Sequence, residues 1–331
     1  MPDRVPTPGN QPADEEELRP EDAMERAASG GIQAESALAT AAALEGGPSE
    51  YQASLWKDAW RQLRKKPLFL IASSLLIVFI LMALFPGLFT DQDPRACDLA
   101  NSAGKPQEGH WFGFDIQGCD YFTRVVYGTR VSLIIGLLVI GVDVVIAIIL
   151  GSIAGYYGGF WDGFIARIAD IWFALPTVLG GIVFLNALGE RGLLQVSFVL
   201  IFLQWPTLTR LMRSSVLSGK EMDYVQAARA LGASDWRIMR SHILPNGIAP
   251  VIVYGTIAVG IIISAEAALS FLGVGLQLPA ISWGLMISAA QNRILIHPHL
   301  LLFPALFLSI LVLSFIILGD ALRDALDPRL R

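Results

Sequence analysis

The side chains that could carry acid–base chemistry in the apolar part of this chain are few and far apart. Three carboxylates fall inside apolar stretches, at Asp143, Asp170 and Glu266. A charge inside a membrane span is costly, so such a residue usually faces a cavity or a partner side chain. No chain of partners for a proton relay is evident. For each carboxylate, a structural hydrogen-bonding role and a role in substrate passage remain open.

The sequence lacks the motifs of common catalytic sites. The Gly-Lys pair at 219–220 has neither the first glycine nor the following hydroxyl residue of a phosphate-binding loop. No zinc-protease motif, paired-cysteine motif or nucleophile elbow occurs. The histidines are scattered, and only His297 and His299 are close in sequence, which is a weak metal pattern. Nothing therefore argues for an enzyme or for a resident metal on this chain alone.

Composition indicates that membrane helices must position these residues. The 331 residues are 54% hydrophobic with a mean hydropathy of +0.55, which is too apolar for an ordinary soluble protein. A helix needs about 20 mostly apolar residues to cross a bilayer. The fold expected is an all-α, polytopic bundle of six transmembrane helices, at residues 68–89, 131–156, 164–188, 194–211, 249–274 and 300–321.

Basic residues predict the orientation of this bundle. If the segment before the first span is cytoplasmic, fifteen Lys and Arg residues after position 50 lie inside and six lie outside. The positive-inside rule then places both termini in the cytoplasm. The polar segment 221–246 lies on the longest cytoplasmic loop between spans.

The predicted outer loop, residues 91–130, holds the only two cysteines of the chain, Cys97 and Cys119. The outer face of a cell membrane is oxidising, so a disulfide between them is expected. Two free thiols are the alternative.

The N-terminal residues 1–50 differ in character from the rest. They hold eleven acidic and three basic residues and are rich in Ala, Gly, Pro, Glu and Ser. Such a composition buries too little apolar surface to offset the entropy of ordering, so a disordered cytoplasmic tail is expected, as a spacer or as a partner-binding segment. A basic amphipathic segment and the first span, residues 51–90, follow this tail.

The polar segment 221–246 has the pattern of two short helices with a joint. Its first part is rich in Ala, and Gly232 can take the positive φ that a helix end often requires. Ser234 or Asp235 can cap a second helix that runs to about residue 243, and Pro245 marks its end. We therefore expect a helix, a tight joint and a second helix on the cytoplasmic surface.

Small and basic side chains on this segment suit a docking site. Ala227 and Ala228 would let the backbone of another protein approach closely, and Arg229, Arg237 and Arg240 offer charge to a partner or to lipid headgroups. An amphipathic helix that lies at the membrane surface is the alternative.

The segment resembles the coupling loop of bacterial ABC importer permeases, which reads E-A-A, a spacer glycine and then H-x-L-P. The matching residues are Gln226-Ala227-Ala228, Gly232 and His242-Ile243-Leu244-Pro245, with Gln226 in place of the usual glutamate. Other motifs are similar to the C-type permease of dipeptide and oligopeptide importers: YGTRVSL at 127–133, GYYGGFWDGFIARIAD at 155–170, EAALSFLGVG at 266–275, SWG at 282–284 and GDALRDALDPRLR at 319–331. The likeness covers residues 55–331. The family tends to show a G-R-D triplet before the second span, and this chain has Gly118-Cys119-Asp120 there. One of its two cysteines thus replaces the family arginine, which favours the disulfide.

The resemblance implies a type I importer permease, with residues 131–331 as its core. It implies a B-type permease as the second half of the pore and two ATPase subunits that bind ATP and Mg. An extracytoplasmic binding protein would deliver di- or oligopeptides. The chain itself would carry no cofactor and no catalytic site. The residues expected to contact an ATPase subunit are Gln226, Ala227, Ala228, Gly232, Asp235, Arg237, His242 and Pro245. Those expected along a substrate pathway are Asp170, Trp205 and Glu266.

Three rival interpretations remain open. A permease of a nickel-chelate or other small-solute importer would have the same architecture and another cargo. A self-sufficient channel or secondary transporter would need its own coupling-ion site and symmetric broken helices, and no repeat between the two halves is evident. A membrane enzyme would need a catalytic constellation that the sequence lacks. Nothing points to a nucleic-acid partner; the other contact expected is membrane lipid.

Overall fold

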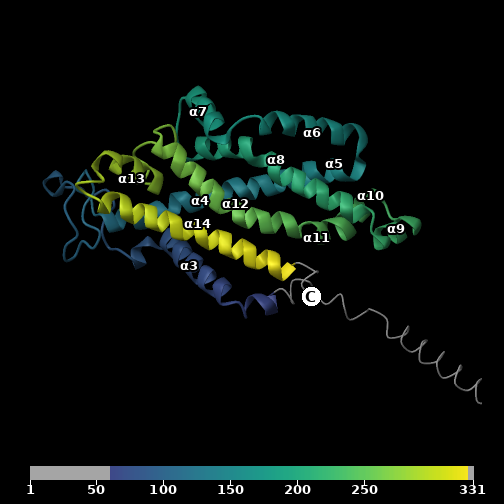
Figure 1. Ribbon diagram of the computed structural model, residues 1–331, viewed down its shortest axis with the longest axis horizontal. Coiled ribbons are helices and arrows are strands. Elements are labelled where there is room, and N and C mark those ends of the chain that lie inside the picture. Colours follow the sequence, from purple (N-terminus) through teal and green to yellow (C-terminus); the bar gives the residue numbers. More distant parts are fainter. Residues whose placement is uncertain (1–59, 327–331) are drawn as a thin grey trace, which may run out of the picture. The chain divides into compact units, whose positions relative to one another are not determined.

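A computed structural model describes residues 60–326, and the expected tail at 1–50 lies outside them. The described part is built from helices and contains no β-strand (Figure 1). Its larger helices are α3 (Pro67–Leu84), α4 (Tyr121–Ile146), α5 (Ser152–Tyr157), α6 (Gly159–Phe173), α7 (Thr177–Leu188), α8 (Leu193–Lys220), α12 (Ala249–Phe271), α13 (Trp283–Ala290) and α14 (His299–Leu326). The expected all-α polytopic fold is confirmed.

Four helical stretches in residues 60–326 are long and apolar enough to cross a membrane. They are α3, the continuous helix Tyr121–Tyr157, α12 and α14. The stretch Tyr121–Tyr157 joins α4 to α5 through a π-helical turn at Ala147–Gly151. It begins well before the predicted residue 131, because Asp120 caps it by accepting the Thr123 N–H at 2.8 Å.

The candidate span at 164–188 is bent in the structure. This stretch breaks into α6 and α7, which meet at an angle of 89°. Pro176 explains the break, because proline lacks an N–H and disfavours helical geometry in the residue before it. The two helices together are either one broken span or a re-entrant loop.

The helix α8 is longer and more polar than the span predicted at 194–211. It runs for 28 residues, contains Pro206 and does not reach the hydropathy of the four membrane helices. Its basic second half faces α6: Arg210 bonds to Asp170, and Arg213 pairs with Asp162, with Nη2 2.6 Å from Oδ2. These ion pairs explain why a helix with so many charges packs in the bundle.

Bulky apolar side chains of α3, α4, α7, α8, α12, α13 and α14 form the largest core. Trp283 in this core is fully buried and donates its Nε1–H to the Val125 carbonyl oxygen at 3.0 Å. The rings of Phe79 and Phe307 pack edge-on against this indole, with centroids at 6.0 and 6.3 Å. One tryptophan thereby fixes the short helix α13 against three longer ones.

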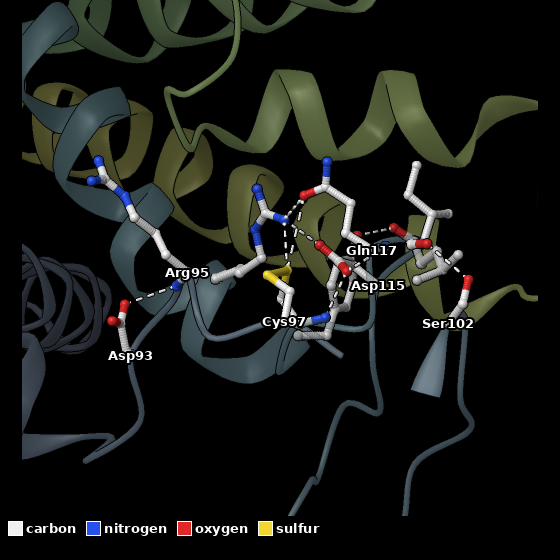
Figure 2. Close-up of polar contacts among 11 residues, drawn as sticks. Asp93, Arg95, Cys97, Ser102, Asp115 and Gln117 are labelled. Atoms are coloured by element: carbon white, nitrogen blue, oxygen red, sulfur yellow. Dashed lines mark hydrogen bonds and ion pairs between the residues drawn. A yellow bond between two sulfur atoms is a disulfide. The ribbon is translucent and has the colours of Figure 1, made fainter. Parts of the chain in front are cut away.

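The segment between α3 and α4 covers one end of the bundle, which we call the disulfide end (Figure 1), and Figure 2 shows its polar contacts. A disulfide joins Cys97 to Cys119. Asp115 accepts the N–H groups of Gln117 and Cys119 at 2.8 and 2.9 Å, and it bonds to Arg124 of α4. The disulfide thus closes the segment on itself, and the ion pair of Asp115 with Arg124 fastens the segment to α4. Residues 221–248 form the opposite end, the loop end (Figure 1).

Alanine substitutions at Gly151 and Gly141 are expected to distinguish the effect of close helix packing from the effect of helix propensity on stability. A Cβ at Gly151 would lie 2.7 Å from the Thr209 carbonyl oxygen and from Met212 Cβ of α8, whereas a Cβ at Gly141 in the same helix would meet nothing within 4 Å. Gly151→Ala should therefore lower the stability of the purified protein by about 1–3 kcal/mol. Gly141→Ala should be neutral or stabilising by up to about 1 kcal/mol. Thermal unfolding of both variants tests this, and equal midpoints would contradict the packing.

The disulfide is expected to be present in protein prepared without reductant. Alkylation followed by intact-mass analysis should then find no labelled cysteine before reduction and two after it. The two cysteines are 22 residues apart in sequence, and the bridge restricts the unfolded chain over this loop. The double variant Cys97→Ser, Cys119→Ser should therefore lose about 3 kcal/mol of unfolding free energy. Two thiols that react without reductant would refute the pairing.

Candidate functional site

The loop end consists of short helical pieces in the order that the sequence suggested. They are α9 (Asp223–Ala230), α10 (Asp235–Ile238), a π-helical turn at Met239–Ile243 and α11 (Leu244–Gly247). The prediction that Pro245 ends the second helix is wrong. Pro245 lies in the first turn of α11, where the missing N–H costs little, and the chain continues into α12.

Gly232 forms the joint between α9 and α10, with the positive φ that was predicted, at 80°. The N–H of Ala233 bonds to the Ala228 carbonyl oxygen and that of Gly232 to the Arg229 carbonyl oxygen, both at 3.0 Å. This is a Schellman motif, which ends a helix with a left-handed residue. A Cβ on Gly232 would meet nothing within 4 Å, so backbone conformation alone favours glycine here.

Two side chains fasten this segment to the bundle. Gln226 donates its Nε2–H to the last carbonyl of α8, Lys220 O, at 3.1 Å. Tyr156, at the end of α5, donates its hydroxyl to Asp235 Oδ1 at 2.6 Å. Ser234 occupies the N-cap position of α10 but makes no side-chain capping bond, so α10 is held by Tyr156. Movement of the segment must therefore move α5 and α8.

The two alanines of the motif have different environments. Ala227 is exposed, whereas Ala228 is only 9% exposed and packs in a cluster with Val216, Val225 and Ile238. The expectation that a partner backbone approaches Ala228 therefore does not fit this structure. The small side chain instead lets α9 lie close to α8 and α10.

Large apolar side chains at the loop end are exposed, and the sequence analysis missed them. Leu231 is 89% exposed and Trp236 is 69% exposed, on either side of Gly232. Met222 and Tyr224 are also exposed, as are Arg229, Arg237 and Arg240. Exposed apolar side chains with basic neighbours are typical of a protein–protein contact. Their position beside a helix-ending glycine was the available signal. His242, by contrast, is half-buried near Tyr224.

The three residues assigned to a substrate pathway have different partners. Asp170 bonds to Arg210 and remains half exposed, and the Trp205 ring lies 6.0 Å from that of Trp172. Glu266 is completely buried in α12 and accepts the Ser270 hydroxyl at 2.8 Å. Asp170 and Trp205 thus belong to the contact of α6 with α8, while Glu266 bonds within α12.

Glu266 supports the turn from α12 to α13. The Ser270 hydroxyl that donates to Glu266 also accepts the Leu276 N–H at 3.1 Å. A Cβ at Gly275 would come within 2.5 Å of the Ser270 backbone nitrogen, so the turn packs directly on this serine. As predicted for an intramembrane carboxylate, Glu266 faces protein.

The described residues, 60–326, contain no group of three or more His, Cys, Asp or Glu side chains placed to hold a metal ion. The rings of His297 and His299 lie 5.9 Å apart near the start of α14, and these two histidines belong to no such group within the described residues.

Glu266→Leu is expected to damage the protein more than Glu266→Gln. Leucine leaves the buried Ser270 hydroxyl without its acceptor, at a cost of about 1–3 kcal/mol, while glutamine retains an acceptor oxygen. Yield, thermal midpoint and transport should fall in the order wild type, Gln, Leu. A Leu variant that melts and transports like wild type would show that the Glu266–Ser270 bond is dispensable.

Comparison with known proteins agrees with this arrangement. Residues 147–331 match the family described as binding-protein-dependent transport system inner membrane component. Residues 54–106 match the N-terminal TM domain of oligopeptide transport permease C. The first match alone covers more than half of the chain and includes the whole loop end.

Named relatives align with most of the length of this chain. The dipeptide transport system permease protein DppC of Alkalihalophilus pseudofirmus is 40% identical over 281 residues, which is 84% of this chain and 91% of the relative. The oligopeptide transport system permease protein OppC of Bacillus subtilis is 38% identical, covering 86% and 92%. The glutathione transport system permease protein GsiD of Pectobacterium atrosepticum is 36% identical, covering 83% and 92%. The chain therefore belongs to the family of inner membrane components of binding-protein-dependent transport systems.

Proposed function

We propose that this chain is the C-type permease subunit of an ATP-driven importer of di- or oligopeptides. The observation that carries this proposal is the loop end: a segment anchored to two bundle helices, with Leu231 and Trp236 exposed beside a rigid glycine joint. In a chain of this family, such a surface suits contact with a separate motor subunit.

The cargo is proposed from the relatives. Their names give dipeptide, oligopeptide and glutathione as the transported molecules, and all three are peptides or built from amino acids. A binding protein outside the cell would deliver the peptide, and a related B-type permease would form the other half of the pore.

The orientation proposed places the loop end in the cytoplasm and the disulfide end outside. The excess of Lys and Arg on the loop-end side supports this orientation, and a disulfide suits the oxidising outer face. Six crossings result if the bent pair α6–α7 and the helix α8 each cross once in contact with the second permease. A broken or polar helix is tolerated in a membrane where protein covers it.

Coupling would pass through packed helices and would need no catalytic residue on this chain. ATP and Mg would bind to the motor subunits, whose closure moves the loop end. The bonds Tyr156–Asp235 and Gln226–Lys220 carry this movement to α5 and α8. The ion pairs between α8 and α6 pass it on to the bent pair. ATP then biases the bundle between two packings of the same helices.

Substitutions at the exposed loop positions are expected to release the motor subunits. Leu231→Arg and Trp236→Asp replace exposed side chains, so the permease should fold and reach the membrane normally. Co-purification of the ATPase subunits should fall at least about tenfold, because the central apolar residues of an interface are each worth about 1–4 kcal/mol. Leu295→Arg is the matched control, since Leu295 is 95% exposed and lies before α14 at the opposite end.

Gly232→Val tests the joint separately. The β-branched side chain tolerates positive φ badly, so the α9–α10 angle should change. We expect a variant that retains the B-type permease but hydrolyses ATP without uptake of a labelled dipeptide. If all three loop variants bind ATPase subunits and transport like the Leu295 control, the loop end is only a surface helix.

A further inference from the structure

A small cavity lies among α4, α8 and α12, near the middle of the Tyr121–Tyr157 helix. Its volume is about 20 Å³, which is room for one particle the size of a water molecule. The polar residues around it are Asp143 of α4, Gln204 and Thr207 of α8 and Tyr254 of α12. This cavity is separate from the loop end and from the Glu266 network.

Asp143 is the unusual member of this lining. It is 0% exposed, and neither of its carboxyl oxygens has a hydrogen-bond partner within residues 60–326. Burial of a charged group without a partner strongly destabilises a fold, and buried charges are normally paired or coordinate a metal. Asp143 must therefore either hold a proton or be completed by a ligand that residues 60–326 do not provide.

Among the described residues, no Lys, Arg or His lines the cavity. The basic residues farther along α8, Arg210 and Arg213, are bonded to Asp170 and Asp162 of α6. The groups that face Asp143 from α8 and α12 instead carry neutral oxygen atoms, in the amide of Gln204 and the hydroxyls of Thr207 and Tyr254. The lining thus combines one carboxyl group and three neutral oxygen-bearing side chains with five apolar residues.

The backbone hydrogen bonding of two helices that line the cavity is interrupted beside it. The N–H of Ala147 is shared between the carbonyls of Asp143 and Val144, and the π-helical turn Ala147–Gly151 follows directly. On α8, Pro206 lies between Gln204 and Thr207 and cannot donate a backbone bond. Short π-helical segments are frequent at functional sites.

We propose that this cavity binds one dehydrated monovalent alkali cation, with Asp143 as its charged ligand and oxygens of Gln204, Thr207 and Tyr254 as neutral ligands. Hard cations prefer such oxygen donors, and a divalent ion would ordinarily take more carboxylates and more space. A water molecule alone would leave the carboxylate charge uncompensated. A cation held at this point would bind α4, α8 and α12 to one another and stabilise one packing of the bundle.

Ion-dependent thermal unfolding of the full chain in complex with its partner subunits tests this site. We expect the wild-type midpoint to rise by several degrees in sodium, potassium or lithium chloride relative to choline chloride at equal ionic strength. Asp143→Asn should abolish this rise without lowering the midpoint in choline chloride, because the neutral amide needs no counter-ion. Ser132→Ala is the control: Ser132 is a buried, unpartnered hydroxyl of α4 outside the cavity lining, and its variant should keep the full response.

Direct binding of a radioactive alkali ion to the complex is the second measurement. It tests the site even if the Asp143→Asn variant folds poorly. Radioactive sodium should bind to the wild-type complex at one ion per permease chain, and an excess of the preferred unlabelled ion should displace it. Thr207→Val should weaken this binding. The proposal is overturned if no alkali ion binds or raises the midpoint, or if Asp143→Asn responds to the ions as wild type does. A wild-type midpoint that depends on pH through Asp143 but not on alkali ions would also overturn it, in favour of a protonated carboxyl group.

Discussion

The close approach of the Tyr121–Tyr157 helix to α8 is the constraint on which the rest of the structure depends. At Gly151 and Gly155 no side chain separates the two helices, and carbonyl oxygens of α8 would lie 2.7–2.8 Å from an added Cβ. This contact brings Tyr156 within reach of Asp235 and so sets the position of the loop end. It also places Asp143 against the proline-containing part of α8.

The long apolar helices could be predicted from the sequence because hydropathy and helix length are local properties. The positive φ of Gly232 was predictable for the same reason, since a glycine that ends a helix commonly adopts the left-handed conformation. The full length of α8 was not, because it depends on tertiary partners: the pairs of Arg210 and Arg213 with α6 keep a polar helix in place. The inward orientation of Ala228 was also missed, since an eight-residue helix has too few turns to reveal its buried face.

Two completely buried carboxylates show how the same residue type takes different roles. Glu266 has Ser270 as a hydrogen-bond donor and holds a turn between two helices. Asp143 has no such donor and lies beside a cavity. Sequence alone gave both the same expectation, because only the packed structure shows which side chains surround each group. The first is a structural support, and the second is a candidate ligand.

The central claim is that the loop end contacts the ATPase subunits through Leu231 and Trp236. The most direct test is a photo-crosslinking amino acid placed at Trp236, with the same label at Leu295 as the control, in cells that produce the whole transporter. The account predicts a crosslink from position 236 to an ATPase subunit and none from position 295. Absence of any ATPase crosslink from position 236, in a complex that transports peptide, would contradict it.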